Sequence, residues 1–242
     1  MLEDVEGIVI SEQDFKESSK IINIYTKKYG IIGLMAKGAK SLKSPLRSST
    51  TKLSYGIFTI YYKEGKLSLL KEVNILDNFK NILKDITLIS FATYLVELAC
   101  QVYKESENEN IYDILISGLK KINNKFDPLV ITNIMELKYL EYLGVLPVID
   151  RCSACGKQTN IITLSADTGG YLCTSCHTNE PLINEASIKL IRMYYYVDID
   201  KIDTLNIKKQ YKEEINNFLD LYYERYTGMY LKSKKFLNNI IN

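Results

Sequence analysis

The arrangement of four cysteines constrains the fold of this chain more than any other feature of its sequence. Cys152 and Cys155 form one C-x2-C pair, Cys173 and Cys176 form another, and 17 residues separate the two pairs. This is the spacing of a four-cysteine zinc ribbon, in which each pair places two thiolates on one side of a Zn2+ ion. We therefore predict one zinc ion per chain, held by these four residues.

A hairpin has to bring the two cysteine pairs together, and the intervening sequence predicts one. Residues 161–165 and 171–173 favour short strands, and Asp167-Thr-Gly-Gly170 between them favours a turn. Four thiolates fill a tetrahedral coordination sphere, so no position is left for an activated water molecule. The predicted zinc is structural rather than catalytic.

Two other interpretations of the cysteines are a redox pair and two disulfides. A redox centre needs only one C-x2-C pair at a strand-to-helix junction, and disulfides are rare in the reducing cytoplasm. We expect a cytoplasmic protein because the first thirty residues show no secretion signal. His177 is an alternative ligand, but the complete cysteine set favours a surface role for it. Cys100 lies on an apolar helical stripe and is expected to be a core residue.

The first third of the chain has the pattern of short strands separated by turns. Five segments rich in Ile, Val, Tyr and Leu are expected to be strands: residues 5–11, 20–26, 30–36, 54–62 and 67–73. Gly65 allows a tight hairpin between the last two, because glycine adopts positive φ without strain. Five short strands in this length favour a small closed barrel of the OB-fold or SH3-like type.

After Phe79 the apolar period changes from that of a strand to that of a helix. A long, largely buried helix is predicted from Ile82 to Cys100, with a polar break over residues 104–110. Further helices are predicted over residues 111–122, from Asp127-Pro128 to near Gly144, over 185–196 and over 208–226. No apolar run approaches the ~18 residues of a membrane span, so no membrane association is expected.

The charge is distributed unevenly along the chain. Residues 1–80 hold 13 basic and 9 acidic side chains, whereas the remainder holds 18 and 20. No acidic residue occurs between Glu17 and Glu64. The basic residues of this segment are Lys20, Lys27, Lys28, Lys37, Lys40, Lys43, Arg47, Lys52 and Lys63. Such a cationic segment is typical of proteins that bind a polyanion, with a strong salt dependence and little sequence preference.

The stretch from Lys37 to Arg47 is the best candidate for contact with a phosphate chain. It follows the third predicted strand as a loop, and Gly38, Ser41 and Ser44 keep its backbone accessible. Tyr25, Tyr29, Tyr61 and Tyr62 lie on or beside the same strands and are candidate stacking platforms for bases. The alternative is that the lysines merely solvate the barrel and the tyrosines fill its interior.

The sequence contains no recognisable catalytic constellation. It has a single histidine, no G-x-S-x-G motif, no Walker loop and no G-x-G-x-x-G fingerprint. No pair of carboxylates stands out in an apolar setting. We therefore predict no catalytic residues and no enzymatic activity.

Several motifs, taken together, resemble the bacterial RecO family of DNA repair proteins. The matching stretches are Gly7-Ile-Val-Ile, Tyr29-Gly-Ile-Ile-Gly-Leu-Met-Ala-Lys-Gly-Ala-Lys40, Ser44-Pro-Leu-Arg47, Leu70-Lys-Glu-Val, Tyr94-Leu-Val-Glu-Leu, Leu143-Gly-Val-Leu-Pro147, the cysteine pairs and Lys232-Ser-Lys-Lys-Phe-Leu237. They occur in the expected order over nearly the whole chain.

The resemblance implies an α+β, multi-domain fold: a five-stranded OB-fold barrel, then an all-α domain with the four-cysteine zinc ribbon inserted. The expected boundaries are 1–78 for the barrel, 79–149 and 183–242 for the helical domain, and 150–182 for the ribbon.

The resemblance also implies a function. RecO proteins bind single- and double-stranded DNA, anneal complementary strands, and act with RecR to load RecA onto DNA coated by single-strand-binding protein, whose C-terminal tail they contact. Lys37, Lys40, Lys43 and Arg47 match the basic loop of the family. With Lys20, Lys27 and Lys28 they form the predicted DNA-binding set. A zinc-ribbon adaptor that binds only proteins, without direct DNA binding, remains the alternative. In the leading interpretation, the protein is cytoplasmic and associated with the nucleoid.

Overall fold

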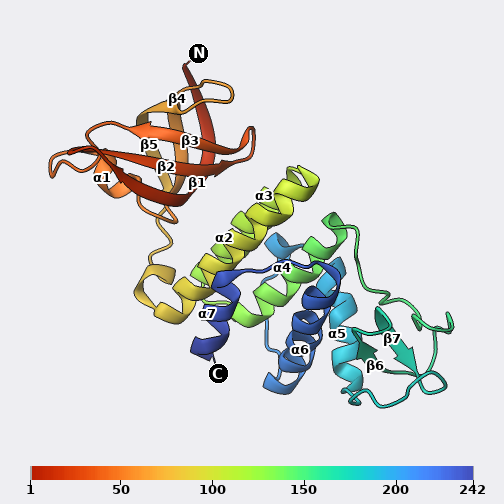
Figure 1. Cartoon of the computed structure of the whole chain (residues 1–242). Helices are drawn as coiled ribbons and strands as arrows, with labels where there is room; N and C mark the ends of the chain where they lie inside the picture. The colour runs from red at the N-terminus through yellow and green to blue at the C-terminus, as the bar shows by residue number, and fades with distance from the viewer. Residues whose placement is uncertain (1, 242) are drawn as a thin grey trace. The chain divides into compact units, whose positions relative to one another are not determined.

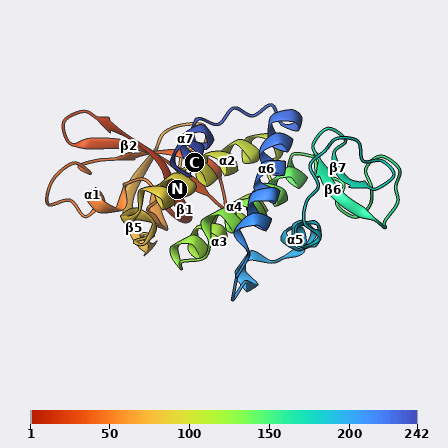
Figure 2. The ribbon, with the colours of Figure 1, turned by 90° about the horizontal axis from the view of Figure 1, so that it is seen from below.

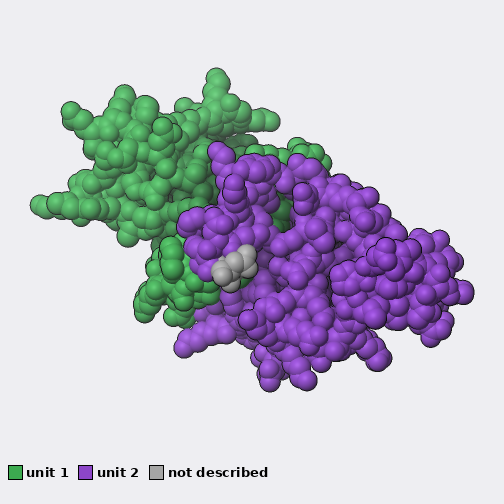
Figure 3. Space-filling model, turned by 60° about the horizontal axis from the view of Figure 1, so that its bottom comes forward, with its two compact units in different colours: residues 1–116 green, residues 117–242 purple. Residues whose placement is uncertain are grey.

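The computed structural model describes residues 2–241, whose path is drawn in Figure 1. The chain forms two compact units, residues 1–116 and residues 117–242, which Figure 3 distinguishes by colour. Each unit is described by itself below.

The first unit contains a closed five-stranded barrel. Its strands are β1 (Leu2–Phe15), β2 (Ser19–Thr26), β3 (Gly30–Ala36), β4 (Tyr55–Tyr61) and β5 (Ser68–Asp77). They follow the order β1-β2-β3-β5-β4, with β4 returning to pair with β1 (Figure 1). Only the β3–β5 pair is parallel among these strands. This is the expected OB-fold arrangement, so the predicted fold class is confirmed.

Alternating apolar residues fill the barrel. Ile22 and Ile24 on β2 and Phe58 and Ile60 on β4 are fully buried, as the period of two in a strand requires. Gly65 has a φ of +63° in the β4–β5 hairpin, the conformation expected of it. The burial of these side chains is the main stabilising contribution to the barrel.

Helical segments complete the first unit. They are the one-turn helix α1 (Leu46–Ser49), the 3-10 turn η1 (Ile82–Lys84), the long helix α2 (Ile86–Ser106) and the start of α3 (Asn110–Asn123). The long helix begins four residues later than predicted. Asp85 caps it, accepting hydrogen bonds from the amides of Thr87 (2.8 Å) and Leu88 (3.2 Å), so Ile82 lies in a separate turn.

Among the described residues, α2 alone is long and apolar enough to cross a membrane. However, 56% of its most apolar window is buried inside the protein. That burial is typical of the core helix of a folded domain.

Tyrosines join the barrel to the α2–α3 region within the first unit. The ring of Tyr25 lies 5.1 Å from that of Tyr103 and 5.3 Å from that of Tyr112. The hydroxyl of Tyr112 donates to Glu6 of β1 at 3.3 Å. Gly30 has a φ of +61°, and an added Cβ would lie 2.2 Å from the Tyr103 hydroxyl oxygen, so glycine is required there.

The second unit is a helical bundle that carries a small hairpin. Its elements are α4 (Pro128–Tyr142), β6 (Ile161–Ser165), β7 (Gly170–Cys173), α5 (Glu185–Tyr196), the 3-10 turn η2 (Ile199–Lys201), α6 (Lys209–Tyr226) and α7 (Lys232–Ile241). Helices α4, α5 and α6 pack against one another. Figure 2 shows the β6–β7 hairpin beside the α5–α6 end of this bundle. The final helix, α7, was not predicted from the sequence pattern.

A buried ion cluster attaches α7 to the bundle. Lys234 of α7 places its Nζ 2.8 Å from Glu136 Oε1 of α4 and 2.7 Å from Asp220 Oδ1 of α6. The Glu136 side chain is 1% exposed and that of Lys234 is 19% exposed. Burial disfavours the charge of Lys234, but the two carboxylates outweigh that effect and raise its pKa. The cluster therefore joins three helices through one cation.

Candidate nucleic-acid interface and metal centre

The basic loop after β3 is held in a defined shape by its backbone. The amide of Lys40 donates to the Ser18 carbonyl at 2.9 Å, which ties the loop to the β1–β2 turn. Gly38 has a φ of +71°, and Ala39 is fully buried. Because its centre is anchored in this way, the loop presents its long side chains to solvent from a fixed backbone.

Three cations of the predicted DNA-binding set are available for an external anion. Lys37, Lys43 and Arg47 are exposed, and none forms an ion pair with another residue in the range 2–241. Lys37 and Lys43 lie in the loop and Arg47 on α1 directly after it. These three side chains are the strongest phosphate-binding candidates of the barrel.

The other four cations of the set are paired with carboxylates. Nζ–O distances are 2.8 Å for Lys27–Asp113, 2.6 Å for Lys28–Glu3 and 2.7 Å for Lys40–Asp14, and Lys20 pairs with Glu12. Although the segment itself contains no acidic residue, these four cations are therefore not free for an external anion. The acids come from β1 and α3, outside the segment itself.

These ion pairs shift the pKa values of their carboxylates. The hydrogen bond to Lys40 lowers the pKa of Asp14, and that to Lys28 lowers the pKa of Glu3. Both pairs are thus charged on both sides at neutral pH. Because Lys28 and Asp14 are exposed, each pair contributes little to stability, and a competing phosphate can displace the carboxylate.

The two remaining lysines of the basic segment differ from each other. Lys52 is partly buried, and this burial lowers its pKa, so it is a poor contact for DNA. Lys63 is exposed in the β4–β5 hairpin. Lys66, which the sequence argument did not select, lies three residues later in the same turn and is also exposed.

The four candidate tyrosines have different environments. Tyr25 is fully buried, so it cannot stack on a base, but it packs against Tyr103 and Tyr112 of the helices rather than inside the barrel. Tyr29 and Tyr62 stack on each other, with ring centroids 4.1 Å apart and planes 12° apart. Tyr61 is 40% exposed, and the Lys71 ammonium lies 5.0 Å from its ring centroid.

The four predicted cysteine ligands converge in the second unit. The sulfur atoms of Cys152, Cys155, Cys173 and Cys176 all lie within 4.8 Å of one another, and Cys155 Sγ lies 3.7 Å from Cys173 Sγ. A tetrahedral ion with metal–sulfur bonds of about 2.3 Å sets its sulfurs about 3.8 Å apart. The cluster can therefore hold one metal ion of this kind.

Backbone amides around the cluster favour thiolates at two of the four positions. Burial opposes ionisation of Cys152, but amide hydrogen bonds, led by that of Cys173, outweigh it and lower its pKa to about 6. Amides led by that of Ser175 likewise lower the pKa of Cys173. Hydrogen bonds with the neighbouring thiols, Cys155 first, raise the pKa of Cys176 to about 12. A metal cation at the centre of the cluster would offset the repulsion between neighbouring thiolates.

The remaining candidate ligands lie outside the cluster. His177 is partly buried, and its Nε2 lies 2.8 Å from the Glu180 carbonyl oxygen. Cys100 is buried on α2, and burial raises its pKa to about 12, as expected of a core thiol.

A close backbone approach fixes the β6–β7 hairpin to the chain that leads into it. Val148 pairs with Gly170, and the Tyr171 amide donates to the Val148 carbonyl at 2.9 Å. Gly170 has a φ of +154°, and an added Cβ would lie 2.2 Å from that carbonyl oxygen. The hydroxyl of Tyr171 donates to the Ile188 carbonyl of α5. These contacts position the cysteine cluster relative to the bundle.

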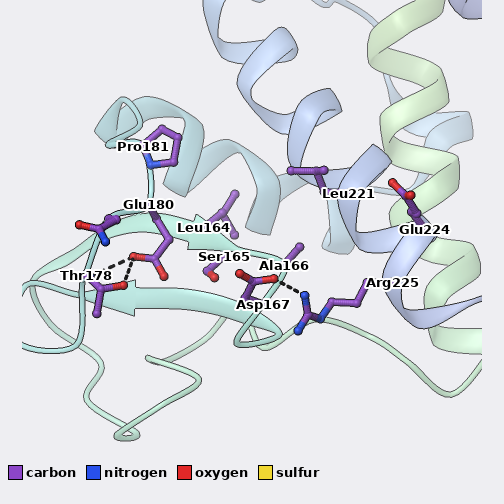
Figure 4. Close-up of a pocket in the computed structure, with 11 residues that line it drawn as sticks. Leu164, Ser165, Ala166, Asp167, Thr178, Glu180, Pro181, Leu221, Glu224 and Arg225 are labelled. Atoms are coloured by element: carbon purple, nitrogen blue, oxygen red, sulfur yellow. Dashed lines mark hydrogen bonds and ion pairs between the residues drawn. The ribbon is translucent and has the colours of Figure 1, made fainter.

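A cavity of 680 Å³ lies between the hairpin and α6 (Figure 4). Leu164 and Pro181 line it from the hairpin side, and Leu221 lines it from α6. The ion pair between Asp167 and Arg225 crosses from one wall to the other.

Carboxylates outnumber cations in this cavity. Glu180 and Glu224 line it together with Asp167, against the one guanidinium of Arg225. The Thr178 amide, which donates to Glu180 at 3.0 Å, lowers the pKa of that carboxyl. The net negative charge of the cavity disfavours a phosphate chain.

Comparison with known families identifies both parts of the chain. Residues 1–79 match the model of the Recombination protein O N terminal family, and residues 83–235 match that of the Recombination protein O C terminal family. The chain belongs to the RecO family. RecO proteins act in DNA repair and recombination, and the family names carry no enzymatic activity.

Individual RecO proteins align over almost the full length of the chain. The DNA repair protein RecO of Listeria monocytogenes serotype 4b (strain CLIP80459) is 35% identical over 243 residues, which is 99% of this chain and 95% of the relative. The DNA repair proteins RecO of Bacillus pumilus (strain SAFR-032) and Bacillus subtilis (strain 168) are each 33% identical over 244 residues, with the same coverage. The resemblance noted in the sequence is therefore confirmed.

Proposed function

We propose that this chain is a recombination mediator that binds single- and double-stranded DNA, anneals complementary strands and, with RecR, promotes the loading of RecA onto DNA coated by single-strand-binding protein. It acts in the cytoplasm, at the nucleoid, without a catalytic step. The observation that carries the proposal is the set of free cations, Lys37, Lys43 and Arg47, on an anchored loop of an OB-fold barrel.

DNA binding in this proposal is electrostatic. Phosphates replace solvent ions around the free cations first, and then compete with the carboxylates that pair with Lys20, Lys27, Lys28 and Lys40. Because backbone contacts leave base edges accessible, a held strand can pair with a complementary one. The helical unit supplies surfaces for RecR and for the C-terminal tail of single-strand-binding protein, and RecA is engaged indirectly.

The metal in the cysteine cluster is proposed to be one structural Zn2+ per chain. Four thiolates match its ligand preference and leave no open coordination position. The hydrophobic core of the ribbon is a small cluster around Cys152, Leu172 and Cys173, which is too small to stabilise it alone. Metal binding therefore supplies folding free energy to the ribbon.

A matched pair of triple variants tests the DNA-binding proposal. Lys37→Ala with Lys43→Ala and Arg47→Ala removes three free cations, whereas Lys20→Ala with Lys27→Ala and Lys28→Ala removes three paired ones. Each phosphate contact contributes about 0.7 to the slope of log affinity against log salt for single-stranded DNA. We expect the first variant to lower that slope by about 2 and the second to change it much less.

Fluorescence anisotropy with a labelled oligonucleotide over a salt series measures these slopes. Unchanged affinity of the first variant at low salt would contradict the assignment, as would equal effects of the two variants. Annealing of complementary strands and RecA loading in the presence of RecR and single-strand-binding protein are then compared for the same proteins.

A zinc-ribbon adaptor without direct DNA binding is the second candidate function. The cavity between the ribbon and α6 favours it, because apolar walls and excess carboxylates suit a protein segment better than a nucleic acid. A gel shift with a short oligonucleotide separates the two candidates: the adaptor produces no shift at any salt concentration.

A further inference from the structure

A recess on the barrel lies apart from the basic loop and brings Tyr62 and Lys63, both noted in the sequence, together with residues of β3. It has a volume of 270 Å³ and is bounded by the first half of β3 and by the β4–β5 hairpin. Gly33, Tyr62, Lys63, Lys66 and Leu67 are among the residues that line it. This volume is below the ~300–1,000 Å³ of sites for drug-sized molecules, so the recess suits one planar ring system.

The chemistry of the recess combines an aromatic ring, aliphatic walls and exposed cations. Tyr29 covers one face of the Tyr62 ring and Tyr62 also packs against the barrel core, so a ligand would contact the part of the ring that lines the recess. Lys63 and Lys66 are exposed and form no ion pair with the residues at positions 2–241. Glu64, also exposed, is the one acidic residue of the same turn.

The carboxylate nearest the stacked tyrosines is already neutralised. Glu3 accepts a hydrogen bond from the Tyr29 hydroxyl and pairs with Lys28, whose Nζ lies 2.6 Å from Glu3 Oε2. The Lys28 ammonium also lies 4.7 Å from the Tyr29 ring centroid. A phosphate near this aromatic pair therefore meets a surface without excess negative charge.

The backbone keeps the recess open and its cations in place. At Gly33, an added Cβ would lie 3.1 Å from Leu67 Cδ1, so any larger side chain would intrude on the recess wall. The hairpin is held by hydrogen bonds from the Lys63 amide to Ser68 Oγ (2.9 Å) and from the Lys66 amide to the Lys63 carbonyl (3.3 Å).

Strand β3 connects the recess to the basic loop. Gly33 lies in the recess, and Lys37 begins the loop four residues later, a distance of about 13 Å along an extended strand. A nucleic-acid strand held by the loop thus reaches the recess within a few nucleotides. In OB-fold proteins generally, this face and the β4–β5 loop are where oligonucleotides bind.

We propose that the recess takes one unstacked base of a single-stranded DNA, which contacts the Tyr62 ring while Lys63 and Lys66 bind the flanking phosphates. This inference rests on the proposed DNA-binding function and adds a means of distinguishing strands. A base in a duplex is stacked and paired, so it cannot enter the recess. Binding to the recess therefore favours single strands, whereas the basic loop accepts either form.

Replacement of Tyr62 tests the inference. Loss of one base–aromatic contact weakens binding to single-stranded DNA about 5- to 100-fold. We expect Tyr62→Ala to show this loss for an oligothymidine, with a smaller effect on a duplex of the same length, and Tyr62→Phe to restore most of it. Tyr61→Ala is the matched control, because it removes the same ring from the adjacent position, which does not line the recess.

Two further measurements separate a base contact from a structural effect. An oligonucleotide with abasic sites should bind the wild-type protein more weakly than oligothymidine and should be insensitive to Tyr62→Ala. Gly33→Val, which leaves Tyr62 in place and fills the recess, should reproduce the selective loss for single strands.

The inference is overturned if abasic and normal strands bind equally, or if Tyr62→Ala and Tyr61→Ala have the same effect. In those cases the salt-dependent binding by the basic loop, and with it the proposed function, still stands. Failure of the wild-type protein to bind either form of DNA would overturn both.

Discussion

The ion cluster around Lys234 allows a quantitative test of how α7 is held. Replacing Lys234 by methionine keeps most of its aliphatic stem but removes the ammonium that contacts Glu136 at 2.8 Å and Asp220 at 2.7 Å. Glu136 cannot reach solvent without displacing its helix, because it is 1% exposed, whereas Asp220 is 32% exposed and already meets solvent.

The magnitude follows from the burial of the two carboxylates. Removing one partner of a fully buried ion pair costs 3–5 kcal/mol, and the partial exposure of Asp220 places this cluster at about 3 kcal/mol. For a protein of this size, that corresponds to a decrease of roughly 6–12 °C in Tm. Because the pKa of Lys234 is raised in the fold, its contribution is complete below pH ~10.4 and is lost only as the pH rises through the raised value.

Thermal and urea unfolding, followed by circular dichroism, measure the effect for Lys234→Met and for Lys235→Met. Lys235 is the adjacent, exposed residue of α7, so its replacement should change stability by less than about 0.5 kcal/mol. The difference between wild type and Lys234→Met should be constant around neutral pH and shrink in strong alkali, as Lys234 loses its charge. Equal stabilities of the two variants at neutral pH would refute the role of the cluster.

Three further predictions concern the ribbon and the barrel surface. Cys155→Ser should lose stoichiometric metal and loosen the ribbon while the barrel stays folded; metal analysis showing one bound zinc ion would contradict the ligand assignment. Gly170→Ala should lower the hydrogen-exchange protection of the backbone that pairs with Val148, because an added Cβ would lie 2.2 Å from the Val148 carbonyl oxygen; unaltered protection would argue against this attachment. Asp14→Asn should raise DNA affinity a few-fold by releasing its lysine, whereas Asp4→Asn, which changes the net charge equally, should have less effect in a binding titration.

Local patterns were sufficient to predict most of the regular structure. The alternation of apolar residues along each of the five strands specifies its inward face. The predicted ends of β2 to β5 lie within one residue of the observed ends, except that β5 extends four residues further. The convergence of the four cysteines could be predicted, because the spacing of the two pairs and the turn at Gly169 and Gly170 are local properties of the sequence. Asp85 is a typical helix-capping residue and marks the start of α2, whereas the apolar period alone extends the predicted helix back to Ile82.

Interactions between distant segments could not be predicted in this way. The carboxylates that neutralise Lys27 and Lys40 come from Asp113 and Asp14, and a count of charges along one segment does not include them. The recess forms only because the hairpin folds beside β3, so Lys66 had no reason to be selected from the sequence. Helix α7 is short, and the pairing of its Lys234 with Glu136 and Asp220 depends on residues that lie far away in the sequence.

In the proposed DNA-binding function, the carboxylates that pair with the lysines affect how a strand leaves this surface. Asp14, Glu3 and Asp113 occupy their lysines whenever a phosphate does not, so each behaves as an intramolecular competitor tethered beside its site. When a bound strand leaves, the carboxylate pairs with its lysine again, so the lysine ammonium is not left without a counter-charge. In the proposed function, such a surface would exchange one strand for another quickly and hold none of them for long, which suits a protein proposed to pass DNA to a partner.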